Sequence, residues 1–175
     1  TKKRLEDELR EKIRLEYETK AQKKSEEARK KAEEEKKRNE ETRRKAEKEL
    51  TTSIEKNDFK TVIHLMRAHL QNAEVQEHGC IALWKMIRPT RTTLSKDSNK
   101  ENEIAIAQAG GIEAILSAMK AHPGVAQVQE EACLALINLA GNNSDNRVKI
   151  AKAGGIEAVL AAMKAHPGVA NVQEQ

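Results

Sequence analysis

The sequence predicts an all-α protein: a long charged helix followed by an α-solenoid, a stack of similar helical units. Three observations predict this fold class. Residues 109–130 and 153–174 are identical at 19 of 22 positions, the first 50 residues contain 19 Lys or Arg and 15 Asp or Glu, and the whole chain of 175 residues has one Trp, one Tyr and one Phe. Near-duplicate segments at a fixed spacing are typical of repeat proteins. A core poor in aromatic side chains suits helices packed on helices better than a β-sandwich or barrel.

Residues 1–52 are expected to form the long helix. The segment has no Pro or Gly, and opposite charges recur four residues apart, as in Glu6–Arg10, Glu8–Lys12 and Glu16–Lys20. Each such pair contributes only ~0.2–0.5 kcal/mol, but many of them in one segment stabilise a helix in water. So many charged side chains leave too little apolar surface to offset the conformational entropy that a globular fold costs.

Two interpretations of this helix stay open. Leu5, Leu9, Ile13 and Tyr17 are four residues apart and form an apolar stripe, a candidate contact patch. In the first interpretation the helix is a single solvated spacer. In the second it is part of a coiled coil or lies along a filament, with this patch as its contact. The mass of residues 1–50 in solution distinguishes a monomeric spacer from a dimer.

The formal net charge is +4, and the surplus lies in the first 50 residues, where both signs are interleaved. Interleaved charges give little net field at a distance, which disfavours nucleic-acid binding. RNA binding through the charged helix is kept as an alternative, and a steep salt dependence of binding would favour it. No apolar run approaches the ~20 residues of a membrane span, and no signal-peptide core precedes the charged start. We expect a soluble, cytoplasmic protein.

The near-duplicate segments define a repeat of 44 residues, and a weaker copy precedes them at an offset of 53, where Phe59 matches Ile112 and Cys80 matches Cys133. We therefore expect a first, divergent copy at 53–88, an exposed loop at 89–100, a second copy at 101–143 and a third copy at 144–175, which we interpret as truncated. The Pro, Thr and Ser residues near 88–99 indicate the loop. Arg91–Thr92–Thr93 is a short match to a phosphorylation site.

Each complete copy is predicted to contain three helices. The first, at 146–152, ends at Gly154–Gly155, residues that can adopt a positive φ. The second and third, at 156–165 and 125–140, each carry one apolar row at helical spacing: Ile156, Val159, Leu160 and Met163 in the former, and Val128, Ala132, Leu136 and Leu139 in the latter. None of these helices can bury its apolar side alone, so the copies are expected to stack around a shared core.

The AGGI turn (109–112) and the ACLALINLA stretch (132–140) resemble the armadillo-repeat family over about residues 54–175. The resemblance implies a right-handed superhelix in which the third helix of each copy lines a concave, protein-binding groove. Helical geometry puts one column of residues opposite the buried row, on that groove: Glu77, Ile81 and Lys85 in the first copy, Gln127, Glu130, Leu134 and Asn138 in the second, and Glu174 in the third.

Armadillo proteins that carry nuclear import signals have a Trp in this column and an Asn four residues later, which clamp a basic peptide. This chain has Asn138, but Leu134 stands at the Trp position, and Ile81 and Lys85 replace the pair in the first copy. The resemblance therefore implies a transport adaptor only as the alternative function. Trp84 lies one residue off the column; we favour a core residue, with an anchor for a partner as the alternative.

No pattern in the sequence predicts catalysis, a metal site or a cofactor. Cys80 and Cys133 occupy equivalent positions in two copies, as small core residues do, and no CxxC pair occurs. His122 and His166 stand at equivalent helix ends, where a structural role is expected. The expected function is a non-enzymatic scaffold or adaptor that binds protein in its groove. The long helix would tether it to a second site, in an assembly that is cytoskeletal or ciliary by analogy.

Overall fold

A computed structural model describes residues 2–88, 96–141 and 143–173, and within these residues the protein is helical without strands. This confirms the all-α prediction. The helices, in order, are α1 (Lys2–Glu55), α2 (Phe59–Ala68), α3 (Ala73–Ile87), α4 (Lys96–Gln108), α5 (Gly111–Ala121), α6 (Ala126–Ala140), α7 (Ser144–Lys152), α8 (Gly155–Ala165) and α9 (Ala170–Gln173). They belong to two compact units, residues 1–42 and 43–175.

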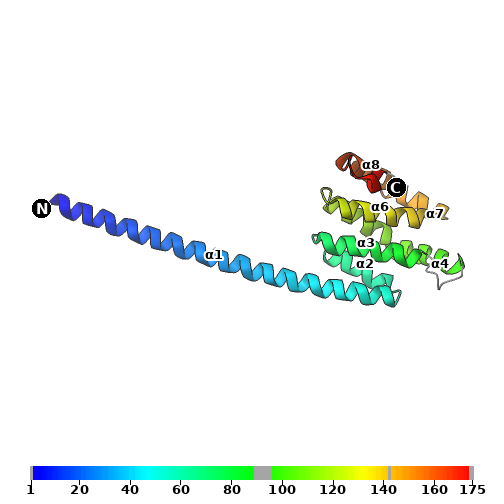
Figure 1. Ribbon diagram of the computed structural model, residues 1–175, viewed down its shortest axis with the longest axis horizontal. Coiled ribbons are helices and arrows are strands. Elements are labelled where there is room, and N and C mark those ends of the chain that lie inside the picture. The colour runs from blue at the N-terminus through cyan, green and yellow to red at the C-terminus, as the bar shows by residue number, and fades with distance from the viewer. Residues whose placement is uncertain (1, 89–95, 142, 174–175) are drawn as a thin grey trace. The chain divides into compact units, whose positions relative to one another are not determined.

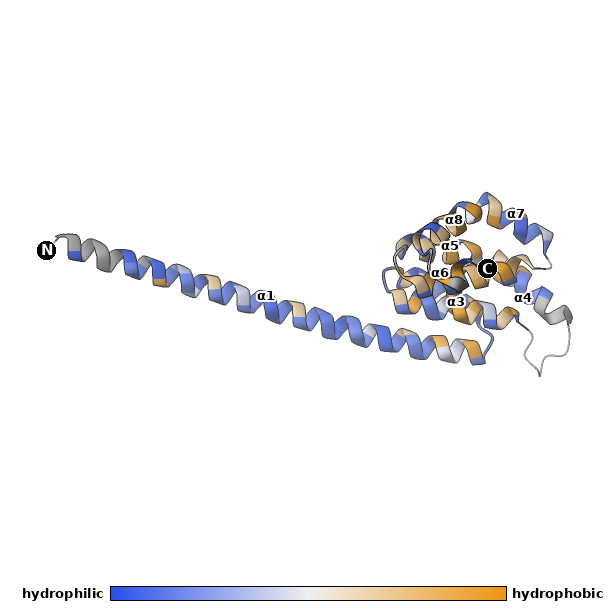
Figure 2. Ribbon diagram, turned by 45° about the horizontal axis from the view of Figure 1, so that its top comes forward, coloured by the Kyte–Doolittle hydropathy of each residue, from blue (hydrophilic) through white to orange (hydrophobic). Residues whose placement is uncertain are grey.

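The first unit is a stretch of α1 whose side chains face solvent. Every side chain from residue 14 to residue 39 is exposed, and Figure 2 shows how polar this helix is. Ion pairs four residues apart join Arg14 to Glu18, Glu26 to Lys30 and Glu33 to Lys37, with N–O distances of 3.0–3.2 Å. They are instances of the spacing that predicted a solvated helix.

The candidate contact patch is described only at Tyr17, whose side chain is 75% exposed. The side chains of Leu5, Leu9 and Ile13 lie outside the described residues, as do those of Glu6 and Glu8, so the patch stays a prediction.

The last turns of α1 belong to the second unit. The sequence predicted a boundary at residue 52, but α1 runs to Glu55, and Ala46, Leu50 and Ser53 are buried. These three residues recur at i, i+4 and i+7, so they lie on one side of the helix. The last turns of α1 thus take the place in the first copy that α4 takes in the second copy and α7 in the third. Sequence analysis missed this short buried row because most residues of the segment are charged.

The second unit is built from copies of the same helices laid side by side. Helix α2 contacts α5 and α5 contacts α8, while α3 contacts α6 and α6 contacts α9. Figure 1 shows α3, α6 and α8 following one another in chain order. One hydrophobic core runs through the copies, and its members include Val62, Leu83, Ile115 and Leu136. The later near-duplicate segment adds Ala162 and Val172 to this core. Its predicted apolar row is only partly buried, however, because Ile156 and Leu160 are 59% and 51% exposed.

The segment 89–100, predicted as a loop, is helical from Lys96, where α4 begins. The five residues 96–100 thus extend a helix, which corrects the prediction. Beyond Pro89 this segment has no Pro or Gly that would disfavour a helix. Residues 89–95, including Arg91–Thr92–Thr93, lie outside the described residues.

The glycine pairs form the turns that the sequence predicted. Gly110 and Gly154 both have φ +85°, a left-handed conformation, directly before α5 and α8. A Cβ on the next residue, Gly111, would lie 2.5 Å from Ile106 Cγ2, and one on Gly155 would lie 2.4 Å from Ile150 Cγ2. The first glycine makes the turn, and the second lets two helices approach closely.

A glutamine side chain joins the helices within each copy; it is buried in Gln76 and Gln129 and exposed in Gln173. Gln76 Nε2 donates to the carbonyl oxygens of Met66 and His69, both at 2.9 Å. Two further glutamines make the equivalent pair of bonds: Gln129 to Met119 and His122, and Gln173 to Met163 and His166. The carbonyls at a helix C-terminus have no partner within the helix, so this side chain supplies a donor to the Met carbonyl. The His carbonyl also accepts a backbone N–H, from Asn72, Val125 and Val169 in the three copies. The sequence analysis missed these glutamines, although their recurrence in VQE was visible.

Histidine and asparagine side chains tie structure between copies. His122 Nε2 lies 2.7 Å from Leu70 O, and His166 Nε2 lies 2.9 Å from Pro123 O, the equivalent residue one copy later. Each ring nitrogen meets a carbonyl oxygen, so it carries the proton and donates. Asn102 Nδ2 similarly donates to Met86 O at 2.7 Å, and Asn146 Nδ2 to Leu139 O at 3.0 Å.

The Gln129→Ala substitution is expected to lower the free energy of unfolding by about 1–3 kcal/mol, because it removes the side-chain donor of Met119 O in a buried turn. The other acceptor, His122 O, keeps its bond from Val125 N. Urea unfolding followed by circular dichroism measures this. Gln127→Ala, at an exposed position of the same helix, is the matched control and should change stability little. Equal effects of the two substitutions on the free energy of unfolding would show that the bonds of Gln129 do not stabilise the fold.

Candidate functional site

The predicted groove residues that are described lie on α3 and α6, two helices that pack against each other. Because α3 and α6 are equivalent helices in successive copies, their matching residues face the same way. Lys85 and Gln127 are exposed, and the other described members of the column, Glu77, Ile81, Glu130, Leu134 and Asn138, are half-buried. We call this set the α3/α6 face. Glu174 lies outside the described residues.

The middle of this face is apolar. Ile81 and Leu134 are equivalent residues on the two helices, and both keep part of their surface in contact with solvent. Ile137, one turn beyond Leu134, is 39% exposed. Partly exposed aliphatic side chains that neighbour one another are a common feature of protein-binding surfaces.

Trp84 lies beside this centre and connects the two helices. Its Nε1 donates a hydrogen bond of 2.8 Å to Glu131 Oε2, and one part of the indole packs against the core. Lys85 Nζ and Arg88 Cζ lie 5.8 and 5.9 Å from the ring centroid, at the range of cation–π attraction. The interpretation of Trp84 as a core residue is thus correct for part of the ring only. Sequence reasoning missed Glu131, because the bond joins residues 47 apart.

Asn138 is held by its own helix. Its Nδ2 donates to Leu134 O at 2.7 Å, so one of the two amide hydrogens is engaged within α6. The amide oxygen is the acceptor that this side chain can offer to a partner's backbone N–H.

Charge is distributed unevenly along the face. Acidic residues lie near the N-terminal ends of α3 and α6, namely Glu74, Glu77, Glu130 and Glu131, while Lys85 and Arg88 lie near the C-terminal end of α3. In α3, Glu74 in the first turn and Lys85 in the last turn complement the helix dipole. The Arg43 guanidinium pairs with Glu74 as well as with Glu47. The face is therefore acidic at one end, apolar in the middle and basic at the other end.

The cysteines are core residues, as predicted. Both are free thiols and buried, and desolvation raises the pKa of the Cys80 and Cys133 thiols. A thiol held in its neutral form is a poor nucleophile and a poor metal ligand. In the described part of the chain, His, Cys, Asp and Glu side chains do not gather in groups of three or more that could hold a metal ion.

Glu103 on α4 is a carboxyl group at a core position. It is 6% exposed, and it is equivalent to Leu50 of α1 in the first copy, which is 2% exposed. Burial raises the pKa of the Glu103 carboxyl, and nearby Lys100 partly opposes this. Its Oε2 has no hydrogen-bond partner among the described residues. Glu103 belongs to α4 and not to the α3/α6 face.

The length and composition of the helices bear on whether any of them could cross a membrane. Within the described ranges no single helix is both long and apolar enough to cross a membrane. Lys100–Gln108 of α4 and Gly111–Ala121 of α5 are long and apolar enough only when taken together, and the two are bent by 66°.

Comparisons with known proteins give one partial similarity. No protein-family model matches the chain, and no solved structure matches it. Among curated proteins, Protein aardvark of Dictyostelium discoideum is 35% identical over 81 residues. The matched segment is 46% of this chain and 11% of that protein. The chain thus spans about a tenth of the length of this relative, and the similarity concerns one segment only.

The Glu103→Gln substitution is expected to stabilise the protein at pH 7. The folded-state pKa of this carboxyl is above its unfolded value, so the folded protein loses stability as the pH rises from the unfolded pKa through the folded one. The gain from Gln should therefore be largest at neutral pH and shrink towards pH 4. Thermal unfolding across this pH range measures it, with the exposed Glu101→Gln as the control. A gain in thermal stability that does not depend on pH would contradict the raised pKa of the Glu103 carboxyl.

Proposed function

We propose that this protein is a non-enzymatic scaffold that binds a segment of a partner protein on the α3/α6 face. The observation that carries the proposal is the equivalent pair Ile81 and Leu134, two partly exposed aliphatic residues on adjacent helices between an acidic and a basic end. A surface with an apolar centre and a charged rim is what protein interfaces typically have.

The architecture proposed for the second unit is an α-solenoid of armadillo-type repeats. Its support is the three-helix copy, the glycine turn with positive φ at Gly110 and Gly154, and the row-by-row contacts of α2 with α5 and α3 with α6. In a solenoid each unit contacts only its neighbours and the equivalent helices form one continuous surface. The α3/α6 face is then part of the groove that such a surface forms.

The charge pattern indicates which partner segment fits. Basic side chains of the partner would lie by Glu77 and Glu130, apolar side chains on Ile81 and Leu134, and acidic side chains by Lys85. The partner backbone would donate to the Asn138 amide oxygen. A segment with this order of basic, apolar and acidic side chains, bound as an extended chain or a helix, is complementary to the α3/α6 face along its length.

The charged helix of the first unit is proposed to tether the protein to a second site. Its exposed side chains and i,i+4 ion pairs suit a solvated spacer. A cytoplasmic assembly of cytoskeletal or ciliary type would use such a helix joined to a solenoid, by analogy. A transport adaptor is less well supported, because Ile81 and Leu134 stand where the Trp residues of the import receptors would be.

The Leu134→Glu substitution is expected to weaken partner binding at least tenfold, equivalent to about 1.4 kcal/mol, because it puts a charge at the apolar centre. The partner is first identified by crosslinking and mass spectrometry of the native complex, and its affinity is then measured by titration. Asn138→Ala should weaken binding less and leave thermal unfolding nearly unchanged.

Val148→Glu is the matched control, because Val148 is an exposed aliphatic residue of α7, away from this face. If Leu134→Glu and Val148→Glu bind the partner with the same affinity as the unsubstituted chain, the α3/α6 face is not the binding surface.

A further inference from the structure

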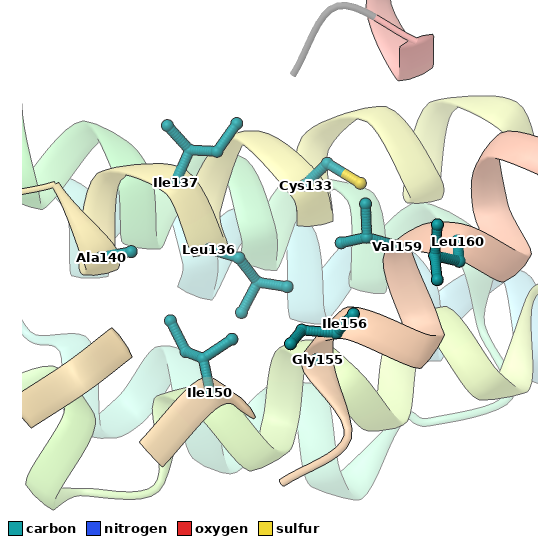
Figure 3. Close-up of a pocket in the computed structure, with 9 residues that line it drawn as sticks. All are labelled: Cys133, Leu136, Ile137, Ala140, Ile150, Gly155, Ile156, Val159 and Leu160. Carbon is teal, nitrogen blue, oxygen red and sulfur yellow. The ribbon is translucent and has the colours of Figure 1, made fainter. Parts of the chain in front are cut away.

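Helix α8 borders a large apolar hollow and a smaller one. The large hollow has a volume of about 290 Å³ and lies between α6, α7 and α8; in Figure 3 Leu136 of α6 and Ile150 of α7 point toward each other across it. Apart from the Cys133 thiol, the side chains that line it are aliphatic, so it presents no charged group that would select a particular ligand. The smaller hollow, between α5 and α8, has a lysine in its wall.

The smaller hollow, which we call the α5/α8 hollow, has a volume of about 120 Å³ and lies between two helices that contact each other. Lys120 and Gln129 contribute to its lining, and the rest of the lining is apolar: Met119, Pro123, Ala158, Ala161 and Ala162. An apolar cavity of about 150 Å³ takes up one benzene molecule. The α5/α8 hollow therefore has room for one aliphatic side chain.

Hydrogen bonds hold the walls of the α5/α8 hollow in place. His166, the C-cap residue of α8, donates from Nε2 to Pro123 O at 2.9 Å and so ties the turn after α5 to α8. Gln129 uses Nε2 for its bonds to Met119 O and His122 O, so the polar atom that it can still offer is its amide oxygen, an acceptor. A hollow that is formed before binding spares its ligand the cost of reorganising the protein.

The approach to the α5/α8 hollow is uncovered. Gly124 follows Pro123 in the turn; its φ is not positive, and a Cβ on it would meet no heavy atom within 4 Å. The fold therefore does not require a glycine here, and Gln71 occupies the equivalent position in the first copy. Because Gly124 has no side chain, the backbone of a bound segment can pass close to the turn.

Lysines of both helices lie beside the α5/α8 hollow. Lys120 is in the last turn of α5 and Lys164 in the last turn of α8, and both are exposed. Lys164 follows Ala161 by three residues, a spacing that makes two residues neighbours on a helix surface. Neither ammonium group forms an ion pair with another described residue. The acidic residues of the same helices, Glu113 and Glu157, lie in the first turns, about 10 Å away along each axis.

We propose that the α5/α8 hollow anchors one aliphatic side chain of a partner protein, in a segment where acidic residues flank that side chain. The aliphatic side chain fills the space beside Met119 and the alanines of α8, and the flanking carboxylates pair with Lys120 and Lys164. An anchor side chain in a preformed pocket is the usual centre of a specific protein contact. This site lies on other helices than the α3/α6 face and does not depend on binding there.

The test is a titration of the isotope-labelled full chain with the peptide Gly-Asp-Leu-Glu-Gly, blocked at both ends, followed by the NMR shifts of the backbone amides. The peptide is expected to bind with a millimolar dissociation constant, as suits a single anchor side chain, and to shift the amides around Lys120 and Ala161. Replacing its Leu by Ser should weaken binding at least about tenfold. Replacing its Asp and Glu by Asn and Gln should weaken binding at least about twofold.

Variants of the chain test the site from the protein's side. Ala161→Leu fills the hollow and should weaken binding of the peptide at least about tenfold, whereas Ala165→Leu, at an exposed position of the same helix outside the hollow, should leave binding unchanged. Lys120→Gln should weaken binding about two- to fivefold, with the exposed Lys152→Gln of α7 as its control.

Three results would overturn the proposal. The first is equal binding of the Leu and Ser peptides. The second is a set of shifts around Lys85 and Arg88 in place of Lys120, because the peptide would then bind on the α3/α6 face. The third is tighter binding of acetylated Gly-Gly-Leu with a free carboxyl group, because the occupant would then be a chain terminus. None of these results bears on the prediction for Leu134, which concerns the α3/α6 face.

Discussion

The helices of residues 43–173 depend on neighbouring copies to cover their apolar sides. The comparison of α5 with α8 makes this plain, because the two sequences are nearly the same. Ile112 and Leu116 are buried in α5, whereas their equivalents Ile156 and Leu160 in α8 are more than half exposed. Nothing in the residues themselves differs. What differs is the packing, because α6, a helix of 15 residues, packs on α5, whereas the described part of α9 on α8 has four residues. Burial in this architecture is a property of the stack and not of a single helix.

The polar side chains inside the stack fix how its parts are spaced. Apolar rows alone would tolerate sliding of one helix along another, because burial is not directional. The buried glutamines, represented by Gln129, bond to carbonyls at the turn between two helices, and the histidines, represented by His122, bond across copies. These bonds have directions and short ranges. They define one register for each copy, and repeating them at the next copy propagates the same geometry along the chain.

This division of roles leaves most side chains of the α3/α6 face outside the core and outside the bonds that set the register. The core is formed by the inward side of each helix, and the hydrogen bonds that set the register are made at the turns. Residues such as Ile81, Lys85 and Leu134 take part in neither, so their chemistry can vary without changing the fold. Trp84 is the exception, since its indole packs on the core and its Nε1 bonds to Glu131. Trp84 therefore contributes both to the packing of the helices and to the shape of the α3/α6 face.

The sequence by itself determined the helices and most of their apolar rows, because periodicity, glycine position and charge pattern are local properties. Thus Gly110 and Gly154 were correctly predicted as turns, Val128 and Leu136 as core residues, and the cysteines as buried thiols. The tertiary structure decided what depends on distant residues. It placed Ala46 and Leu50 of the charged helix in the core, began α4 at Lys96, and bonded Trp84 to Glu131. It also decided that nearly identical apolar rows are buried in α5 and partly exposed in α8, because burial depends on the helices that pack against each row.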